Sequence, residues 1–147
     1  MSSKLLKRYD PLSPIQRSVQ MAKVRAKKNR STEMRVAAYL IRSGLCGWRR
    51  HATDIPGRPD FCFVDERVAV FVDGCFWHGC QQCRRNLPHA RRIFWRKKIE
   101  SNRRRDRRIG RLLRSEGYSV IRIWEHSLGD GRWMARLHRA LRRCGVV

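Results

Sequence analysis

The chain has 147 residues, of which 41% are hydrophobic, enough for the core of one compact domain. Its 35 lysines and arginines against 12 acidic residues give a formal net charge of +23. Such a charge makes the compact state self-repelling and indicates a polyanionic partner, most simply nucleic acid. No apolar stretch approaches the length of a membrane span, and no basic helix shows a clean apolar face, so a membrane partner is not expected.

The N-terminal segment is predicted to be a basic arm at residues 1–25, ahead of a single domain at residues 26–147. Residues 1–30 contain nine lysines and arginines together with Pro11 and Pro14. This pattern is typical of a segment that becomes ordered on phosphate, and a plain disordered tail is the alternative. Because no apolar leader is visible, we expect a cytoplasmic protein whose cysteines stay reduced.

The remaining elements are expected to alternate in type. A helix should run from Ser31 to about Arg42, with Met34, Ala37, Ala38 and Ile41 as its apolar face. Strands are predicted at Trp48–His51, Asp60–Val64, Val68–Val72 and Tyr118–Trp124, and further helices at about Arg91–Ser115 and Arg132–Arg143. The order predicts an α/β fold: one domain with a central mixed β-sheet flanked by helices.

Two acidic residues mark the ends of neighbouring strands. Asp60 precedes one strand and Asp73 ends the next, so their carboxylates can converge on a Mg²⁺ ion, with the Val72 carbonyl as a further ligand. Mg²⁺ on a phosphodiester neutralises charge and activates water. The layout resembles the PD-(D/E)xK nucleases, although Cys75 stands where that pattern has its lysine. The alternative is that both acids are turn or cap residues.

Three further side chains could assist at such a metal. His78, five residues after Asp73, could act as a general base, because the reference pKa of histidine is near 6.5. His51 is a second candidate, and Glu33 could reach the metal through a water. His78 could instead be a zinc ligand or a loop histidine.

The cysteines favour a second metal. Cys75, Cys80 and Cys83 have the spacing C-x₄-C-x₂-C, and three soft ligands favour a structural zinc that needs a fourth ligand. We favour His126, which follows a remote strand, over the competing His78.

Aromatic and basic residues complete the pattern. Phe76 and Trp77 lie inside the cysteine loop, where they could stack on bases or anchor the loop to the core, and Trp95 has the same two options. The predicted helix at about Arg91–Ser115 has an arginine-rich face suited to phosphate contacts.

Several motifs together resemble the very-short-patch repair (Vsr) DNA mismatch endonucleases. They cover about residues 20–128. They are Pro56-Gly57-Arg58-Pro59-Asp60-Phe61, Val70 through Cys80 with its Gly-Cys-Phe-Trp-His run, Phe94-Trp95 with Lys98-Ile99 and Asn102, Arg105-Asp106-Arg107-Arg108, and Val120 to His126 ending in Trp-Glu-His.

The resemblance implies a restriction-endonuclease-like fold, a structural zinc and Mg²⁺-dependent nicking of one strand 5′ to the thymine of a T:G mismatch. The implied catalytic residues are Asp60, His78 and Glu33. Phe76, Trp77 and Trp95 match the intercalating aromatics, and Cys75, Cys80 and His126 match zinc ligands, while Cys83 is placed by spacing alone. Arg58, Arg105 and Arg108 lie in the matching motifs and are candidate DNA contacts.

The partner implied is mismatched double-stranded DNA, with other DNA repair proteins as further candidates, for a monomer in the bacterial cytoplasm at the nucleoid. One departure from the family pattern is Val72-Asp73, where some members have Thr-His. This departure implies that catalysis relies more on a second carboxylate and less on a histidine. The alternatives are a nuclease for another mismatch or a modified base, and a zinc-stabilised DNA-binding protein without catalysis.

Overall fold

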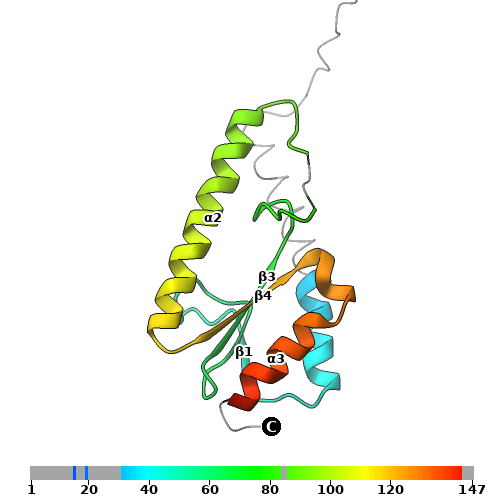
Figure 1. Cartoon of the computed structure of the whole chain (residues 1–147), viewed down its shortest axis with the longest axis vertical. Helices are drawn as coiled ribbons and strands as arrows, with labels where there is room; N and C mark the ends of the chain where they lie inside the picture. The colour runs from blue at the N-terminus through cyan, green and yellow to red at the C-terminus, as the bar shows by residue number, and fades with distance from the viewer. Residues whose placement is uncertain (1–14, 16–18, 20–30, 84–85, 144–147) are drawn as a thin grey trace, which may run out of the picture.

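The computed structural model describes residues 15, 19, 31–83 and 86–143 (Figure 1). The predicted basic arm at residues 1–25 therefore lies, apart from residues 15 and 19, outside the described residues. No helix in the described part of the chain has the length and hydropathy that a membrane span requires.

The centre of the domain is a four-stranded mixed sheet in the order β1-β2-β3-β4. Its strands are β1 (Trp48–Arg50), β2 (Phe61–Phe63), β3 (Val68–Asp73) and β4 (Ser119–Trp124). The first three pair antiparallel, and β4 pairs parallel with β3. Every residue of β3 is buried, as expected of a central strand covered on both faces. The α/β fold class and the mixed sheet are confirmed.

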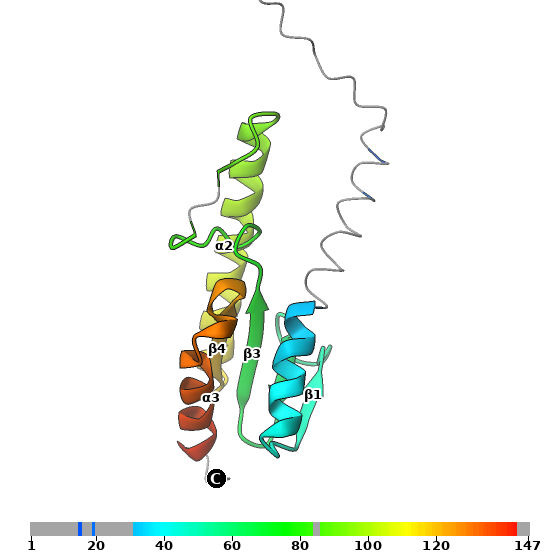
Figure 2. The ribbon, with the colours of Figure 1, turned by 90° about the vertical axis from the view of Figure 1, so that its right-hand side faces the viewer.

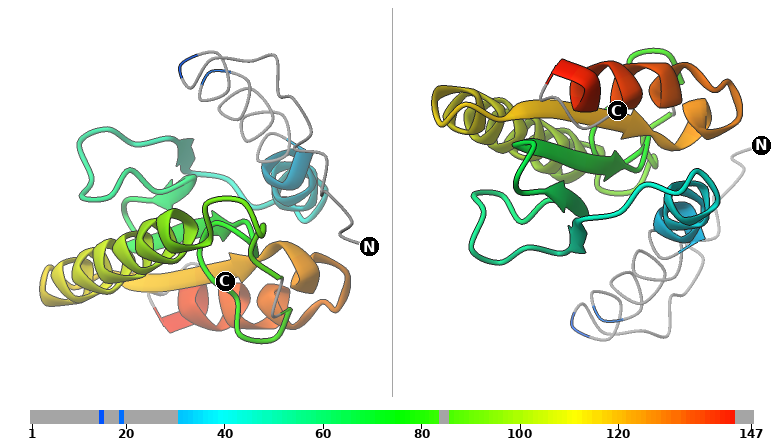
Figure 3. Two further views of the ribbon diagram at one scale, coloured as in Figure 1. Left: turned by 90° about the horizontal axis from the view of Figure 1, so that it is seen from above. Right: turned by 90° about the horizontal axis from the view of Figure 1, so that it is seen from below.

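Helices cover both faces of the sheet (Figures 2 and 3). The helix at residues 31–42 and α3 (Arg132–Arg143) pack on one face, where the larger core includes Leu40, Phe61, Val70 and Leu137. On the other face lies α2 (Arg92–Ser115), over Ala69 and Phe71 of β3. Because side chains alternate along a strand, Asp73 faces α2 as Phe71 does.

The predicted apolar face of the first helix is wrong at Met34, Ala38 and Ile41 and correct at Ala37. Met34 and Ile41 are 54% and 67% exposed, whereas the buried positions are Glu33, Val36, Ala37 and Leu40. Both sets satisfy the helical spacing of three and four residues, so the sequence period alone does not choose between them. The observed face packs Val36 and Leu40 against the sheet and buries Glu33 at the N-terminal end of the helix.

Two segments extend past the sheet toward the same end of the molecule. In Figure 1 the N-terminal part of α2 rises beyond β3, beside the loop that follows β3. A short 3₁₀ helix, η1 (Glu125–Gly129), follows β4 and was not predicted from the sequence. It carries His126 to that end.

Candidate active site and metal centre

Three side chains from separate segments meet at one edge of the sheet. His51 directly follows β1 and Asp60 directly precedes β2, and the pairing of Arg50 with Phe61 places them side by side. Glu33 enters from the first helix, with its Oε2 atom 3.1 Å from Nε2 of His51. Nδ1 of His51 is 3.9 Å from Oδ1 of Asp60. Ligand atoms of all three lie within 4.8 Å of one another, a spacing that suits one metal ion. We call Glu33, His51 and Asp60 the carboxylate group.

The environment of Asp60 favours its protonated form. Burial is the main cause that raises the pKa of Asp60, to about 7, and the nearby Glu33 and Asp73 act in the same direction. The backbone N–H of Val72 opposes this by donating to Oδ2 of Asp60 at 2.6 Å. A divalent cation at Oδ1 would favour the ionised carboxylate.

Asp73 belongs to a different set of contacts. Its Oδ2 atom accepts from Nη1 of Arg122 at 2.6 Å, and Oδ1 lies 3.7 Å from Nδ1 of His78. Burial raises the pKa of Asp73, while His78 and Arg122 oppose that shift. The sequence placed Asp60 and Asp73 together; the structure puts them in one cavity but gives Asp73 a partner of its own.

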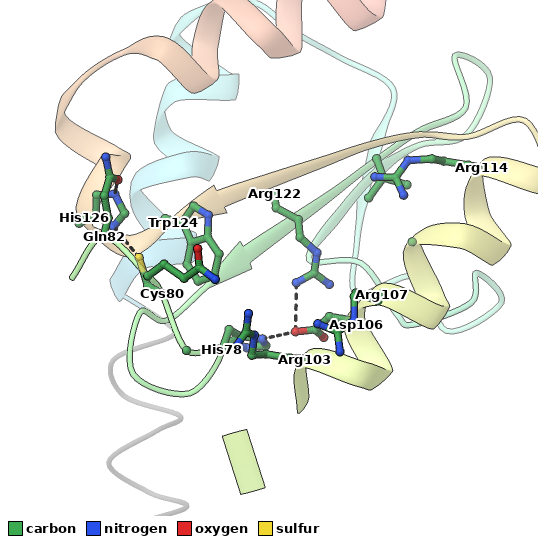
Figure 4. A pocket seen from close by; sticks show the side chains of 14 residues that line it. His78, Cys80, Gln82, Arg103, Asp106, Arg107, Arg114, Arg122, Trp124 and His126 are labelled. Atoms are coloured by element: carbon green, nitrogen blue, oxygen red, sulfur yellow. Dashed lines mark hydrogen bonds and ion pairs between the residues drawn. The ribbon is translucent and has the colours of Figure 1, made fainter. Parts of the chain in front are cut away.

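Asp106 connects this set to His78. His78 Nδ1 donates to Oδ2 of Asp106 at 2.6 Å, and Nη1 of Arg122 lies 3.3 Å from the same oxygen (Figure 4). Burial works against the charged form of Asp106, but the His78 hydrogen bond and Arg122 outweigh it, so the pKa of Asp106 is lowered. With Nδ1 acting as donor, the Nε2 atom of a neutral His78 is left as the proton acceptor.

One cavity of about 640 Å³ connects these groups. It is lined by His51, Gly57, Arg58, Asp60, Phe71, Val72, Asp73, His78, Arg105, Asp106, Ile109 and Arg122. It thus holds the predicted Asp60, Asp73, Val72 and His78, and the predicted DNA contacts Arg58 and Arg105. Glu33 reaches it through His51.

The cysteine loop forms a separate group with η1. Cys75, Cys80, Cys83 and His126 offer ligand atoms within 4.8 Å of one another. Nδ1 of His126 is 3.2 Å from Sγ of Cys75 and 3.6 Å from Sγ of Cys80. Three thiols and an imidazole are the donors of a closed structural zinc site. The fold therefore contains a possible Cys₃His zinc site, which we call the cysteine group.

The hydrogen bonds distinguish the two competing histidines. Nε2 of His126 is 2.6 Å from Oε1 of Gln82, an acceptor that fixes the proton on Nε2 and leaves Nδ1 facing the thiols. The ring of His78 is instead bound to Asp106. Figure 4 shows His126 beside Gln82 and Cys80, and His78 apart from them, joined to Asp106. The arrangement favours His126 as the fourth ligand.

The aromatic residues form a cluster at the projecting end of α2. The ring centroids of Phe76, Trp77 and Trp95 are 5.3–5.5 Å apart in edge-to-face geometry. All three are half-buried, and Phe94 beside them is 46% exposed. The buried Asn102 donates from Nδ2 to the Trp77 carbonyl at 2.9 Å and so ties the loop to α2. The cluster is partly anchored and partly open to solvent.

The outer side of α2 is strongly basic. A surface groove of about 600 Å³ is lined by Ser101, Arg104, Arg105, Arg107, Arg108 and Arg111. This groove contains the predicted contacts Arg105 and Arg108. Salt bridges between exposed groups are weak in water, so the contacts of Arg104 and Arg107 with Glu100 leave these guanidinium groups available to phosphate.

Two residues of the site were not selected from the sequence. Asp106 is an acid at an inward position of an arginine-rich helix, and Arg122 is a charge within the apolar strand Ser119–Trp124. A lone charge at a semi-buried position is a usable signal, because burying it requires a partner. Each turns out to be a partner of the other.

A cavity lined by aspartates and arginines, a histidine held by a carboxylate and a thiol-rich loop, set in a chain of net charge +23, are the features of a nuclease-like class of protein. Comparisons with known proteins agree. The family model described as DNA mismatch endonuclease Vsr matches residues 9–85. The type II nicking enzyme V.XorIIP of Xanthomonas oryzae pv. oryzae is 42% identical over 134 residues, covering 90% of this chain and 96% of that protein.

Two other relatives bear similar names. The type II nicking enzyme V.NmeDIP of Neisseria meningitidis serogroup C is 38% identical, and the match covers 81% of this chain and 80% of that protein. The DNA mismatch endonuclease Vsr of Escherichia coli K12 is 37% identical over 103 residues, and the match covers 70% of this chain and 65% of that protein. The chain belongs to the Vsr family of DNA mismatch endonucleases. It is a DNA endonuclease, and its substrate is DNA.

Proposed function

We propose that this endonuclease nicks one strand of a duplex 5′ to the thymine of a T:G mismatch, using Mg²⁺, and so begins very short patch repair. The observation that carries the proposal is the cavity itself, which both Asp60 and His78 line, with His78 directly following Trp77 of the aromatic cluster in the chain. The name of the Escherichia coli relative, DNA mismatch endonuclease, supports a mismatch as the target.

In this proposal Asp60 is the central ligand of the catalytic metal. Glu33 and His51 lie within reach of the same ion, and Asp73 and the Val72 carbonyl are the ligands expected from the sequence. The ion, when bound, neutralises charge on the scissile phosphate and favours ionisation of the attacking water. Oxygen-rich ligands of this kind fit Mg²⁺.

His78 is the proposed proton acceptor. Asp106 holds the proton on Nδ1, so Nε2 can accept a proton from the attacking water. Asp106 also stabilises the imidazolium that results, and Arg122 compensates the charge of Asp106 and Asp73. These groups together orient one base within the cavity.

The aromatic cluster is proposed to read the mismatch. Phe76, Trp77 and Trp95 would wedge between base steps, which a mismatched pair resists less than a matched one. Arg58, Arg105 and Arg108 would contact phosphates, and zinc in the cysteine group would keep the aromatic loop rigid. We further propose that the protein acts as a monomer in the bacterial cytoplasm, at the nucleoid, alongside other repair proteins.

A nicking assay tests this function. End-labelled duplexes would carry one T:G pair, a matched pair, another mismatch or a modified base, each with Mg²⁺. We expect cleavage of the T strand just 5′ to the mismatch. Asp60→Ala should reduce the nicking rate at least about 10³-fold, because charge stabilisation at the phosphate is lost, while DNA affinity stays within about threefold.

The matched control is Asp54→Ala, which removes an exposed acid from the same loop, where it pairs with Arg49. It should keep full activity. Cleavage of another duplex and not of the T:G duplex would leave the proposed nicking chemistry in place but would change the proposed substrate. Tight binding without cleavage of any duplex would contradict the proposed function.

A further inference from the structure

We infer that the carboxylate group binds the catalytic metal as a three-ligand site, with the His51 imidazole as a direct ligand and Asp73 outside the ligand set. This inference rests on the proposed metal-dependent function and specifies its ligands. It exchanges one ligand expected from the sequence, Asp73, for a nitrogen donor.

The geometry of the three groups fits one ion. Glu33 lies 3.1 Å from Nε2 of His51 and Asp60 lies 3.9 Å from Nδ1 of the same ring, so one imidazole nitrogen would bind the ion. With one ligand atom taken from each residue, the three atoms lie within 4.8 Å of one another, close to the roughly 3 to 4 Å that separates the ligands of an ion at about 2.1 Å. Oδ2 of Asp60 is already bound by the Val72 N–H, which leaves Oδ1 on the side of His51. Arg50 Nη2 donates to Oε2 of Glu33, so one guanidinium balances part of the negative charge.

The fold holds His51 in place from its backbone. Its N–H donates to the carbonyl of Asp60 at 3.2 Å, which continues the pairing of β1 with β2. Its φ of 49° lies in the left-handed region, which non-glycine residues seldom adopt. The ring is thereby turned to lie between two carboxylates from different segments.

Asp73 is engaged elsewhere. Its side chain is only 4% exposed and bonds Arg122 at 2.6 Å, while Arg122 also lies 3.3 Å from Asp106. Moving the Asp73 carboxylate to a metal would break a buried ion pair and leave Arg122 short of a partner, which is costly in a buried setting. Within the cavity, Asp73 is therefore better placed as a partner of Arg122 and His78.

The ligand type predicts the metal preference. Mg²⁺ takes oxygen ligands and gains little from an imidazole nitrogen, whereas first-row transition ions, Mn²⁺ among them, accept both nitrogen and oxygen donors. We therefore expect tighter binding of Mn²⁺ than of Mg²⁺, and a smaller difference between the two affinities when the imidazole is removed.

Titration with Mn²⁺ followed by EPR tests the ligand set without DNA or turnover. The zinc-loaded protein and the variants His51→Gln, Asp73→Asn and His138→Gln would be compared. His138 bonds Tyr39 on the far side of the sheet and serves as the matched control. We expect His51→Gln to weaken Mn²⁺ binding at least about tenfold, by loss of one ligand, with Asp73→Asn and His138→Gln within threefold.

Pulsed EPR of bound Mn²⁺ provides a direct signature and does not depend on His51→Gln folding. A ¹⁴N coupling from imidazole is expected in the unsubstituted protein and in His78→Gln. Absence of this coupling, equal affinity of His51→Gln, a tenfold loss in Asp73→Asn, or no stoichiometric Mn²⁺ binding would each overturn the inference. If nicking fails while the ¹⁴N coupling is present, only the proposed function is lost.

Discussion

The two potential metal groups of this endonuclease are built in opposite ways. Three of the four members of the cysteine group come from nine consecutive residues, and the fourth, His126, is delivered by the end of β4. The carboxylate group takes each member from a different segment of the chain. The first is mostly one loop, completed by a single residue that follows β4, while the second exists only when the first helix and two strands are already packed.

This difference in construction suits the two groups to different functions, one structural and one open to substrate. A four-coordinate group of three thiols and one imidazole has no position left for substrate, which suits a site that stabilises a loop. A long-range group of carboxylates and one imidazole faces a cavity of about 640 Å³ and leaves room for water and phosphate. Both groups contact the same helix, α2, through the residues around them. Changes that separate their effects therefore test the comparison.

The largest effect is expected from the cysteine group. Cys80→Ser removes a buried thiol of the possible zinc site, and structural zinc contributes on the order of 10 kcal/mol to folding in small domains. We expect a fall in melting temperature of more than about 10 °C, because several kcal/mol are lost in a chain of this size. Calorimetry with zinc determination measures both.

Cys46→Ser is the control for this experiment, because Cys46 is exposed and lies outside the group. Its zinc content and melting temperature should match those of the unsubstituted protein. An unchanged melting temperature in Cys80→Ser would mean that the cysteine group carries no structural metal.

Two glycines allow each group to be disturbed separately. A Cβ on Gly79 would lie 2.7 Å from Ile99 of α2, and one on Gly57 would overlap Ile109 of the same helix. Both glycines also have positive φ, so alanine adds backbone strain to the clash, about 2–4 kcal/mol in all. We expect Gly79→Ala mainly to weaken DNA binding through the aromatic loop, and Gly57→Ala mainly to lower the nicking rate.

Gly129→Ala is the matched control, because a Cβ there meets nothing within 4 Å. Binding would be measured by fluorescence anisotropy and the nicking rate in single turnover. Equal losses in both quantities for both variants would show that α2 transmits the change to the whole site and that the two groups are not independent.

The sequence predicts short-range features of this molecule well. The strand and helix positions follow from period and turn residues, and the cysteine spacing alone indicates a metal-binding loop. The fourth ligand of that loop is harder to predict, because the spacing is compatible with both His78 and His126. The structure distinguishes them by their contacts, since His78 bonds Asp106 and His126 bonds Gln82.

Long-range charge pairing is what the sequence did not provide. Asp60 and Asp73 end neighbouring strands, and a shared metal is a natural expectation. Arg122, from the parallel strand β4, bonds Asp73 instead. The two residues are 49 positions apart in the chain, so no local sequence pattern predicts this pairing. The face of the first helix was missed for a related reason: two equivalent apolar stripes exist, and only packing on the sheet selects the one that buries Glu33.

The smallest effect concerns the pH dependence of stability in the carboxylate group. The pKa of Asp60 in the folded protein is about 7, above the value of about 4 expected in the unfolded chain. Between these values the folded state binds more protons, so this residue lowers stability as pH rises from about 4 to 7. Asp60→Asn removes this term and keeps an oxygen for the Val72 N–H.

We therefore expect Asp60→Asn to melt a few degrees above the unsubstituted protein at pH 8 and close to it at pH 5, in zinc-loaded samples without Mg²⁺. Because every other titrating group is shared, the difference between the two melting curves isolates Asp60. Adding Mn²⁺ at pH 8 should narrow or reverse the gap, since only Asp60 gains a ligand bond to the ion. Parallel pH profiles would mean that the Asp60 carboxylate is ionised without a cation, and the carboxylate group would then be a salt-bridge cluster like that around Arg122.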